Sequence, residues 1–437
     1  MTSAHPSGPA EAITPAEPTA TEAFRALVSP RRGFVFFLVF AAVGAAAVQM
    51  STVLLTLSLR ATEISGADAA STISLATGLA GIIALVGLPI VGRMSDRSRS
   101  RLGRRRPFLL LGAGALVIGS VVMLLSTDAW SLTVANLLIT IGAICVGVTT
   151  TALIAEQLPS DRRGPASALI SLSTPMGALI GIGISQPFGG NTTAIVLLPA
   201  VIALVGILLL VIFVRDPQVL QEKGEKGRLL DLVGIFWVNP IRHRDFFLAF
   251  TSRMLVFSGV AAINSFQALF LIEQLGFAPQ ELGTAILLTV VINTGVSLLV
   301  APAMGKLSDR IRRRKPFVVT AAIILGAGLV MASQATDFTM YLVAVAVIAI
   351  GQGVYFSVEL ALATQVLPDP ENPAKDLALI NVANNLPTSI VAAVAPALLA
   401  VGVAGGGHSS NFAALFIAGA VAALLGGLVI SFIRTVK

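Results

Sequence analysis

The chain is a succession of long apolar runs separated by short polar stretches. Twelve of the runs are long enough to cross the hydrocarbon core of a bilayer as a helix, which takes about 20 residues. These runs begin near Gly33, Ala70, Pro107, Trp130, Gly164, Thr193, Asp245, Gln280, Pro316, Phe338, Lys375 and Asn411. Because backbone polar groups in lipid must be satisfied within the segment, apolar runs of this length indicate helices. The pattern predicts an all-α integral membrane protein with twelve transmembrane helices.

The order of runs and polar stretches divides the chain into four parts. We expect a disordered cytoplasmic tail over residues 1–29, six-helix bundles over 30–214 and 245–437, and a cytoplasmic central loop over 215–244. The tail is rich in Ala, Pro, Thr and Glu and has no basic segment typical of a signal peptide. Within the central loop, RLLDLVGIFWVNP has an apolar face with Trp237, which predicts a short helix along the membrane surface.

Composition supports a protein that sits in lipid. Of the 437 residues, 55% are hydrophobic and 12% are charged, too few charges to cover a water-facing surface. The single cysteine, Cys145, excludes an intramolecular disulfide.

The positions of the positive charges, rather than the net charge of +7, indicate an orientation. Of 29 Lys and Arg residues, all but Arg60 and Arg253 lie in the termini or in loops that share one side of a twelve-helix topology. The positive-inside rule makes that side cytoplasmic. We therefore expect a multi-pass protein of the plasma (inner) membrane with both termini cytoplasmic, and we do not expect nucleic-acid binding.

A polar, arginine-rich motif occurs twice. GRMSDRSRSRLGRRRPF runs from Gly92 to Phe108, and GKLSDRIRRRKPF runs from Gly305 to Phe317. The two align apart from a four-residue gap, and a proline precedes each, Pro89 and Pro302. Internal duplication is common among secondary transporters. The motif therefore indicates two pseudo-symmetric six-helix halves.

The duplicated motif resembles the loop between the second and third helices, and its repeat between the eighth and ninth, in the major facilitator superfamily. The ending GRRRPF is most similar to the branch of sucrose:proton symporters and glycoside-pentoside-hexuronide:cation symporters. The resemblance implies alternating access, with the first, fourth, seventh and tenth helices lining a central cavity. It also implies that the loops form a cytoplasmic gate; an anchor that satisfies the positive-inside rule is the alternative. The expected gate residues are Gly92, Asp96, Arg97, Arg104, Gly305, Asp309 and Arg310.

Uncharged polar residues form stripes on several apolar runs. Gln49, Thr52 and Thr56 are spaced i, i+3, i+7, which places them on one face of an α-helix. Hydroxyls bonded to their own helix are the alternative interpretation. The seventh, eighth and tenth runs carry further polar positions. We expect the solute to contact Gln49, Thr52, Thr56, Asn264, Gln267, Asn293, Gln352 and Tyr355.

Two ionisable residues, Arg253 and Glu359, lie deep in the predicted membrane. Each lies about 12 Å from the cytoplasmic end of its helix, at 1.5 Å per residue. Because an unpaired charge there costs roughly 2.5 to 3.5 kcal/mol, we expect pairing or protonation of Glu359. A carboxylate that alternates between these states predicts proton coupling; a permanent structural ion pair is the alternative. The resemblance implies an acid in a Tyr-Phe-x-x-acid-x-Ala-Leu pattern, matched here from Tyr355 to Leu362.

The sequence also departs from what the resemblance implies. The first run has no carboxylate for cation coupling, and the fourth lacks the arginine of drug:proton antiporters. Two Trp and two Tyr offer few aromatic platforms for a sugar. Sugar specificity therefore comes from the resemblance alone.

We expect a secondary active transporter, with proton-coupled symport of a sugar or glycoside-like solute as the leading function. The alternative is proton-coupled export of a small amphipathic metabolite or drug. An enzyme is not expected, because the runs hold no His, no metal cluster and no nucleophile with a base. No cofactor or metal is expected, and without a GxxxxGK[ST] motif the proton gradient is the energy source, with sodium left open. The protein is expected to function as a monomer.

Overall fold

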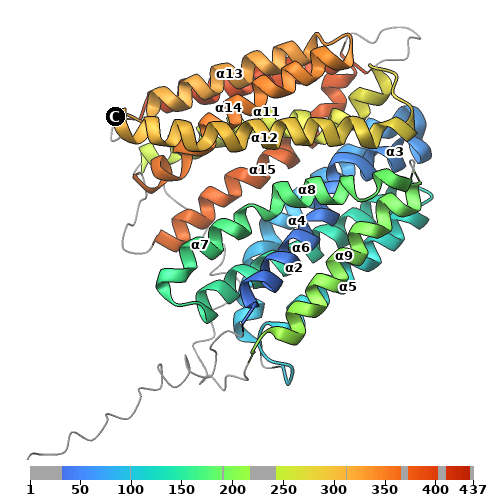
Figure 1. Ribbon diagram of the computed structural model, residues 1–437. Coiled ribbons are helices and arrows are strands. Elements are labelled where there is room, and N and C mark those ends of the chain that lie inside the picture. Colours follow the sequence, from blue (N-terminus) through green and yellow to red (C-terminus); the bar gives the residue numbers. More distant parts are fainter. Residues whose placement is uncertain are drawn as a thin grey trace, which may run out of the picture.

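The computed structural model describes residues 32–98, 100–188, 191–216, 243–311, 313–365, 373–401 and 410–433. The predicted tail and the predicted surface helix of the central loop lie outside these ranges. The described ranges fold into long helices that pack side by side (Figure 1). In the first half these are α2 (Phe34–Ser51), η1 (Thr52–Thr56), α3 (Leu57–Ser65), η2 (Gly66–Asp68), α4 (Ala69–Arg97), α5 (Arg106–Leu125), α6 (Ala129–Gln157), α7 (Ser160–Ser171), α8 (Ser173–Gly183), η3 (Gln186–Phe188) and α9 (Thr192–Phe213). In the second half they are α11 (Arg244–Glu273), α12 (Pro279–Ile311), α13 (Lys315–Ser333), α14 (Phe338–Gln365), α15 (Pro373–Leu399) and α16 (Phe412–Ser431).

These helices account for the twelve predicted passes. Ten segments of the described chain are long and apolar enough to cross a membrane, and the apolar helix Asn385–Leu399 within α15 is shorter. The first segment, Phe34–Arg97, has 64 residues, about three times the length that spans a bilayer. It contains two passes, because Gly66 adopts φ 50° and ends the first helix. The expected twelve-helix architecture is therefore confirmed.

The two halves repeat one packing scheme. In the first half α2 packs on α8 and α9, α5 packs on α6 and α9, and α4 packs on α6. In the second half α11 packs on α15 and α16, α13 packs on α14 and α16, and α12 packs on α14. Each pair in one half has its counterpart in the other, as the duplicated motif predicts.

Small residues allow equivalent close contacts in both halves. A Cβ added to Gly44 of α2 would lie 2.8 Å from the Cα of Ala203 in α9. A Cβ added to Gly259 of α11 would lie 2.9 Å from the carbonyl oxygen of Gly419 in α16. Without a hydrophobic drive between helices in lipid, such close backbone approach is a main source of packing energy.

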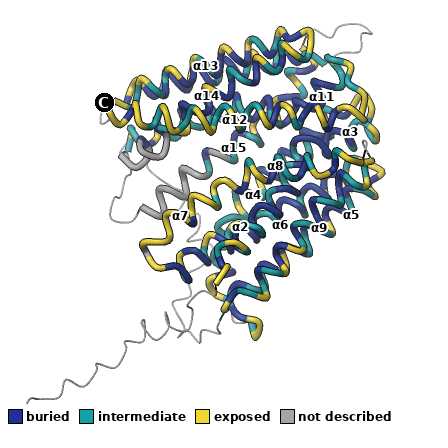
Figure 2. The backbone as a smooth tube through the Cα atoms, in the orientation of Figure 1, coloured by how far each residue is buried: buried dark blue, intermediate teal, exposed yellow. Residues whose placement is uncertain are grey.

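The halves meet through α4 with α15, α8 with α12, and η1 and α3 with α11. Thr284 Oγ1 of α12 donates to Gln186 Oε1 at 2.9 Å, at the end opposite the arginine-rich loops. Ser389 Oγ of α15 donates to the carbonyl of Gly78 in α4 at 3.1 Å. By contrast, α7, at the end with the loops, is exposed along most of its length (Figure 2). The halves are therefore closed together at one end and apart at the other.

Candidate functional site

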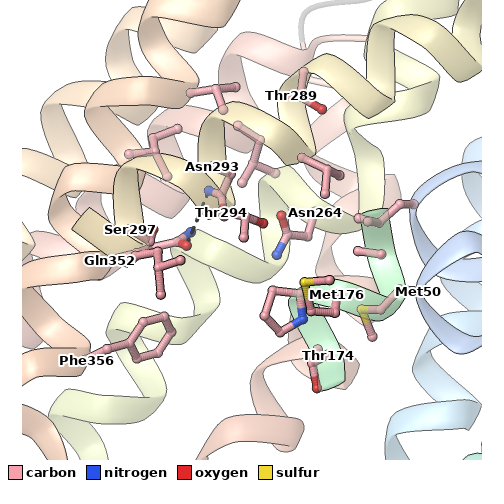
Figure 3. A pocket seen from close by; sticks show the side chains of 18 of the residues that line it. Met50, Thr174, Met176, Asn264, Thr289, Asn293, Thr294, Ser297, Gln352 and Phe356 are labelled. Atoms are coloured by element: carbon pink, nitrogen blue, oxygen red, sulfur yellow. Dashed lines mark hydrogen bonds between the residues drawn. The ribbon is translucent and has the colours of Figure 1, made fainter. Parts of the chain in front are cut away.

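A cavity of about 540 Å³ lies between the two halves. Its volume falls in the range of about 300–1,000 Å³ typical of small-molecule sites. The first half supplies Met50 of α2, Leu54 of η1 and side chains around the α7–α8 junction. The second half supplies side chains of α11, α12 and α14 (Figure 3). The lining residues are Met50, Leu54, Ser171, Leu172, Thr174, Pro175, Met176, Ala178, Ile263, Asn264, Gln267, Thr289, Val290, Asn293, Thr294, Ser297, Leu298, Ala301, Val345, Ile348, Gln352 and Phe356.

Four of the predicted solute-binding residues line this cavity, and all four are carboxamides: Asn264, Gln267, Asn293 and Gln352. Asn293 Nδ2 lies 3.4 Å from Gln352 Oε1, its hydrogen-bond acceptor (Figure 3). The Gln267 side chain is 5% exposed, and neither it nor Asn264 hydrogen-bonds another group in the described part of the chain. Since a carboxamide both donates and accepts, these groups are available to a hydroxylated ligand.

Two hydroxyls of the same wall are already used as donors. Thr289 Oγ1 donates to the carbonyl of Ile286 at 2.7 Å, and Ser297 Oγ donates to that of Ala349 at 3.0 Å. Their oxygens remain as acceptors facing the cavity. Among the described residues, those that line the cavity carry no formal charge. Within the described ranges, no three His, Cys, Asp or Glu side chains gather to hold a metal ion.

Sequence reasoning missed the apolar wall of the cavity. Met50, Pro175 and Met176 lie here, and Phe356 lies at another edge (Figure 3). One sequence signal pointed to Pro175. It lies in the stretch Ser173-Thr174-Pro175, where the fifth pass breaks between α7 and α8. Methionines among many apolar residues give no comparable signal, because they also fill ordinary cores.

The polar stripe on the first pass does not reach the cavity. Residues 52–56 form a π-helix, in which backbone bonds span five residues, so spacing derived from an α-helix no longer places Gln49, Thr52 and Thr56 together. Thr52 and Thr56 are buried, and Thr56 Oγ1 donates to the carbonyl of Ser51 five residues earlier. Gln49 Oε1 is buried without a hydrogen-bond partner. For Thr56 the alternative interpretation, a hydroxyl bonded to its own helix, is therefore the correct one.

Arg253 and Tyr355 come together beside the cavity and do not line it. The Arg253 guanidinium lies 5.5 Å from the centroid of the Phe257 ring, a cation–π contact. The buried Tyr355 ring meets the same Phe257 ring edge-on, with centroids 5.9 Å apart. Glu359 belongs to α14, and its side chain lies outside the described part of the structure. The pairing of Glu359 with Arg253 stays a prediction.

The first arginine-rich loop contains an ion network around one buried arginine. Arg105, 3% exposed, donates to Ser95 Oγ at 2.5 Å, to Asp96 Oδ1 at 2.7 Å and to Glu156. The predicted gate residue Arg104 donates to Asp96 at 3.2 Å and to Glu156 at 2.8 Å. Burial alone would lower the pKa of Arg105, but its hydrogen bonds and attraction to Glu156 and Asp96 raise it. The network fastens the loop to the end of α6.

The end of each motif ties two passes together. Arg106 Nη2 donates to the carbonyl of Val214 after α9 at 2.7 Å, and Lys315 of the second motif donates to that of Ile433 after α16. In the first half Asp216 Oδ2 also accepts the backbone N–H groups of Arg105, at 2.5 Å, and Arg106, at 2.8 Å. A carboxylate at this position satisfies free N–H groups at the start of α5.

Comparison with known families shows what this architecture is. The sequence profile of the Major Facilitator Superfamily matches residues 32–299 and 249–437. The chain belongs to the major facilitator superfamily. It is therefore a membrane transporter and not an enzyme.

Individual relatives in the superfamily are distant. A D-xylose transporter of Levilactobacillus brevis is 30% identical over 110 residues, which span 25% of this chain and 23% of that protein. A D-xylose-proton symporter structure has a TM-score of 0.67 at 17% identity, covering 92% of this chain and 98% of its own. A nucleoside transporter structure has a TM-score of 0.70 at 11% identity, covering 92% and 99%. At these identities the structures show the superfamily fold.

The second loop of this superfamily member differs from the first. Asp309 and Arg310 are exposed, and neither forms an ion pair within the described ranges. Ser308 Oγ, the equivalent of Ser95, is buried without a hydrogen-bond partner. At Gly92 and Gly305 an added Cβ would meet its nearest neighbours at 3.8 and 3.9 Å, which is ordinary contact. Arg97 is exposed and takes part in an interaction within the structure. The gate role of these residues stays a prediction.

Proposed function

We propose that this transporter is a proton-coupled symporter of a sugar or glycoside-like solute, in the branch of sucrose:proton and glycoside-pentoside-hexuronide:cation symporters. The observation that carries the proposal is the cavity between the halves, where four carboxamides lie among described lining residues without formal charge. Carboxamides match the mixed donor and acceptor character of hydroxyl groups. We propose that the protein functions as a monomer, since both halves of one chain contribute walls to the cavity.

The charge distribution supports an orientation in the plasma membrane. The arginine-rich loops lie at the end where the halves are apart, and the positive-inside rule makes that end cytoplasmic. Both termini then lie in the cytoplasm, and the described conformation is open inward. Alternation with an outward-open conformation would carry the solute across.

Proton coupling is proposed at Glu359, with Arg253 as counter-charge. Position 359 lies seven residues after Gln352 and three after Phe356, both of which line the cavity. This i, i+4, i+7 spacing places the three positions on one face of an α-helix. Protonation of a carboxyl group there would remove a charge beside the solute and bias the conformational equilibrium.

The test is uptake of radiolabelled glycosides into proteoliposomes under an imposed inward proton gradient. We expect Glu359→Gln to abolish accumulation while solute counterflow survives, since coupling is lost and binding is not. Glu281→Gln, the same change at an exposed position on α12, is the matched control and should accumulate normally. Accumulation by Glu359→Gln driven by protons, or the absence of any glycoside movement, would contradict the proposal. A parallel sodium gradient identifies the coupling ion.

Export of a small amphipathic compound is the alternative, and the apolar wall around Met50 and Met176 favours it. An outward-directed flux that requires protons moving inward, measured in the same vesicles, would replace import with export.

A further inference from the structure

The cavity has two chemically different walls. On the second half, carboxamides of α11, α12 and α14 are joined by Thr289, Thr294 and Ser297 (Figure 3). Gln267 is the most telling of them, because the residue is 95% buried, lines the cavity and forms no hydrogen bond among the described residues. A ligand in the cavity can therefore use both the donor and the acceptor of its amide.

The opposite wall, on the first half, is largely apolar. Met50, Leu54, Leu172, Pro175 and Met176 dominate it. Of its two hydroxyl residues, Ser171 already donates to the carbonyl of Ser167 at 3.0 Å, which leaves Thr174. Hydroxyl groups of a ligand placed against this wall would lose hydrogen bonds to water without replacement. A flat apolar group fits it, and methionine side chains adapt to such surfaces.

Among the described residues, no charged side chain lines either wall. A carboxylate, phosphate or ammonium group on the ligand would therefore find no counter-charge on these two walls, and its desolvation there would be costly. Uronic acids and sugar phosphates are poor matches for this cavity. A free monosaccharide satisfies one wall and leaves the other against water or hydroxyl groups.

We infer that the solute is uncharged and two-sided, with a glycosyl group bound by the carboxamides and an apolar ring bound by the methionine wall. O-aryl glycosides and nucleosides share this chemistry. The inference rests on the proposed transport function and narrows it to a substrate class. Gln267 and Met176 are the residues that set specificity for the two sides.

The test measures thermal stabilisation of the full chain in lipid nanodiscs free of glycoside detergents, which would themselves present a sugar and an apolar chain. A ligand that binds the folded state raises the unfolding temperature in proportion to ln(1 + [L]/Kd). The probes are phenyl β-glucoside, uridine, glucose and phenyl β-glucuronide. We expect stabilisation by phenyl glucoside or uridine, at least tenfold tighter than by glucose or the charged glucuronide. Whichever of phenyl glucoside and uridine binds more tightly shows whether the solute is an aryl glycoside or a nucleoside.

Matched variants assign the two walls. Met176→Gln should weaken binding of the preferred probe about tenfold, whereas Met176→Leu, which keeps an apolar side chain of similar size, should not. Gln267→Met should weaken binding about tenfold through a lost hydrogen bond. Gln334→Met makes the same change at an exposed position and should have no effect.

The inference is overturned if glucose or the glucuronide binds as tightly as phenyl glucoside and uridine, or if neither two-sided probe binds. Equal behaviour of Met176→Gln and Met176→Leu would also overturn it. A two-sided probe that binds but is not accumulated under any gradient would leave the inference intact and refute proton-coupled import.

Discussion

At the scale of single residues, the two copies of the arginine-rich motif differ in their contacts. Arg105 is buried between Asp96 and Glu156, whereas its equivalent Arg314 is only half-buried. The hydroxyl of Ser95 binds Arg105, and that of Ser308 has no partner. The first loop is therefore locked to its own half in this conformation. The second is held at its end through Lys315, while Asp309 and Arg310 form no ion pair within the described ranges.

Removing Glu156 should expose this difference. Glu156→Gln leaves a buried guanidinium with one carboxylate fewer, so we expect the free energy of unfolding to fall by about 3 kcal/mol. Asp309→Asn, the same loss of charge in the second loop, should change it by less than about 0.5 kcal/mol. Thermal and denaturant unfolding in nanodiscs measure both. Equal destabilisation by the two variants would show that the loops are equivalent.

At the scale of elements, the fifth pass packs against the first through glycines. A Cβ on Gly177 of α8 would lie 2.6 Å from the Cβ of Ala46 and 2.7 Å from its carbonyl carbon in α2. Helices this close cannot accept a methyl group without moving apart. The opposite face of α8 carries Pro175 and Met176 at the cavity, so the contact also fixes the position of the apolar wall.

Gly177→Ala should therefore lower the free energy of unfolding by roughly 1–3 kcal/mol, through overpacking. Gly114→Ala is the matched control, because a Cβ on this helical glycine of α5 meets nothing within 4 Å. There alanine should stabilise the protein by about 0.5–1 kcal/mol, since it restricts the unfolded chain. A shift of the same sign in both variants would mean that helix propensity, and not the α2–α8 contact, decides the outcome.

The elements also show how far the sequence alone can reach. The passes were predictable because lipid leaves helices as the only way to satisfy an isolated backbone segment, and the second-half carboxamides because α11, α12 and α14 keep ordinary helical spacing. Thr52 and Thr56 were predicted to contact the solute but do not line the cavity, because a π-helix changes the spacing along this pass. No residue type there indicates the π-helix. Met176 was missed because apolar residues look alike whether they face a helix, lipid or a cavity.

At the scale of the whole molecule, closure and opening lie at opposite ends. Thr284 and Gln186 join α12 to the end of the fifth pass, while α7, at the other end of that pass, is largely uncovered. The described ion pairs all lie within the first half, so none crosses between halves. Among the described residues, the side-chain hydrogen bonds that join the halves are therefore neutral ones, Thr284 with Gln186 and Ser389 with Gly78.

Thr284→Val should shift the balance between the two conformations toward opening at the end opposite the arginine-rich loops. Loss of one hydrogen bond, worth about 1 kcal/mol, changes the ratio of the two states about fivefold. Labelling of a cavity reporter, Thr294→Cys, by a membrane-impermeant thiol reagent measures it in vesicles of each orientation. The native Cys145 is 1% exposed and adds little background.

Thr320→Val is the control, because Thr320 Oγ1 donates within its own helix to the carbonyl of Pro316, at 2.8 Å. The labelling rate from the end opposite the arginine-rich loops should rise for Thr284→Val and not for Thr320→Val. If it rises equally in both variants or in neither, the Thr284–Gln186 bond does not hold the halves closed.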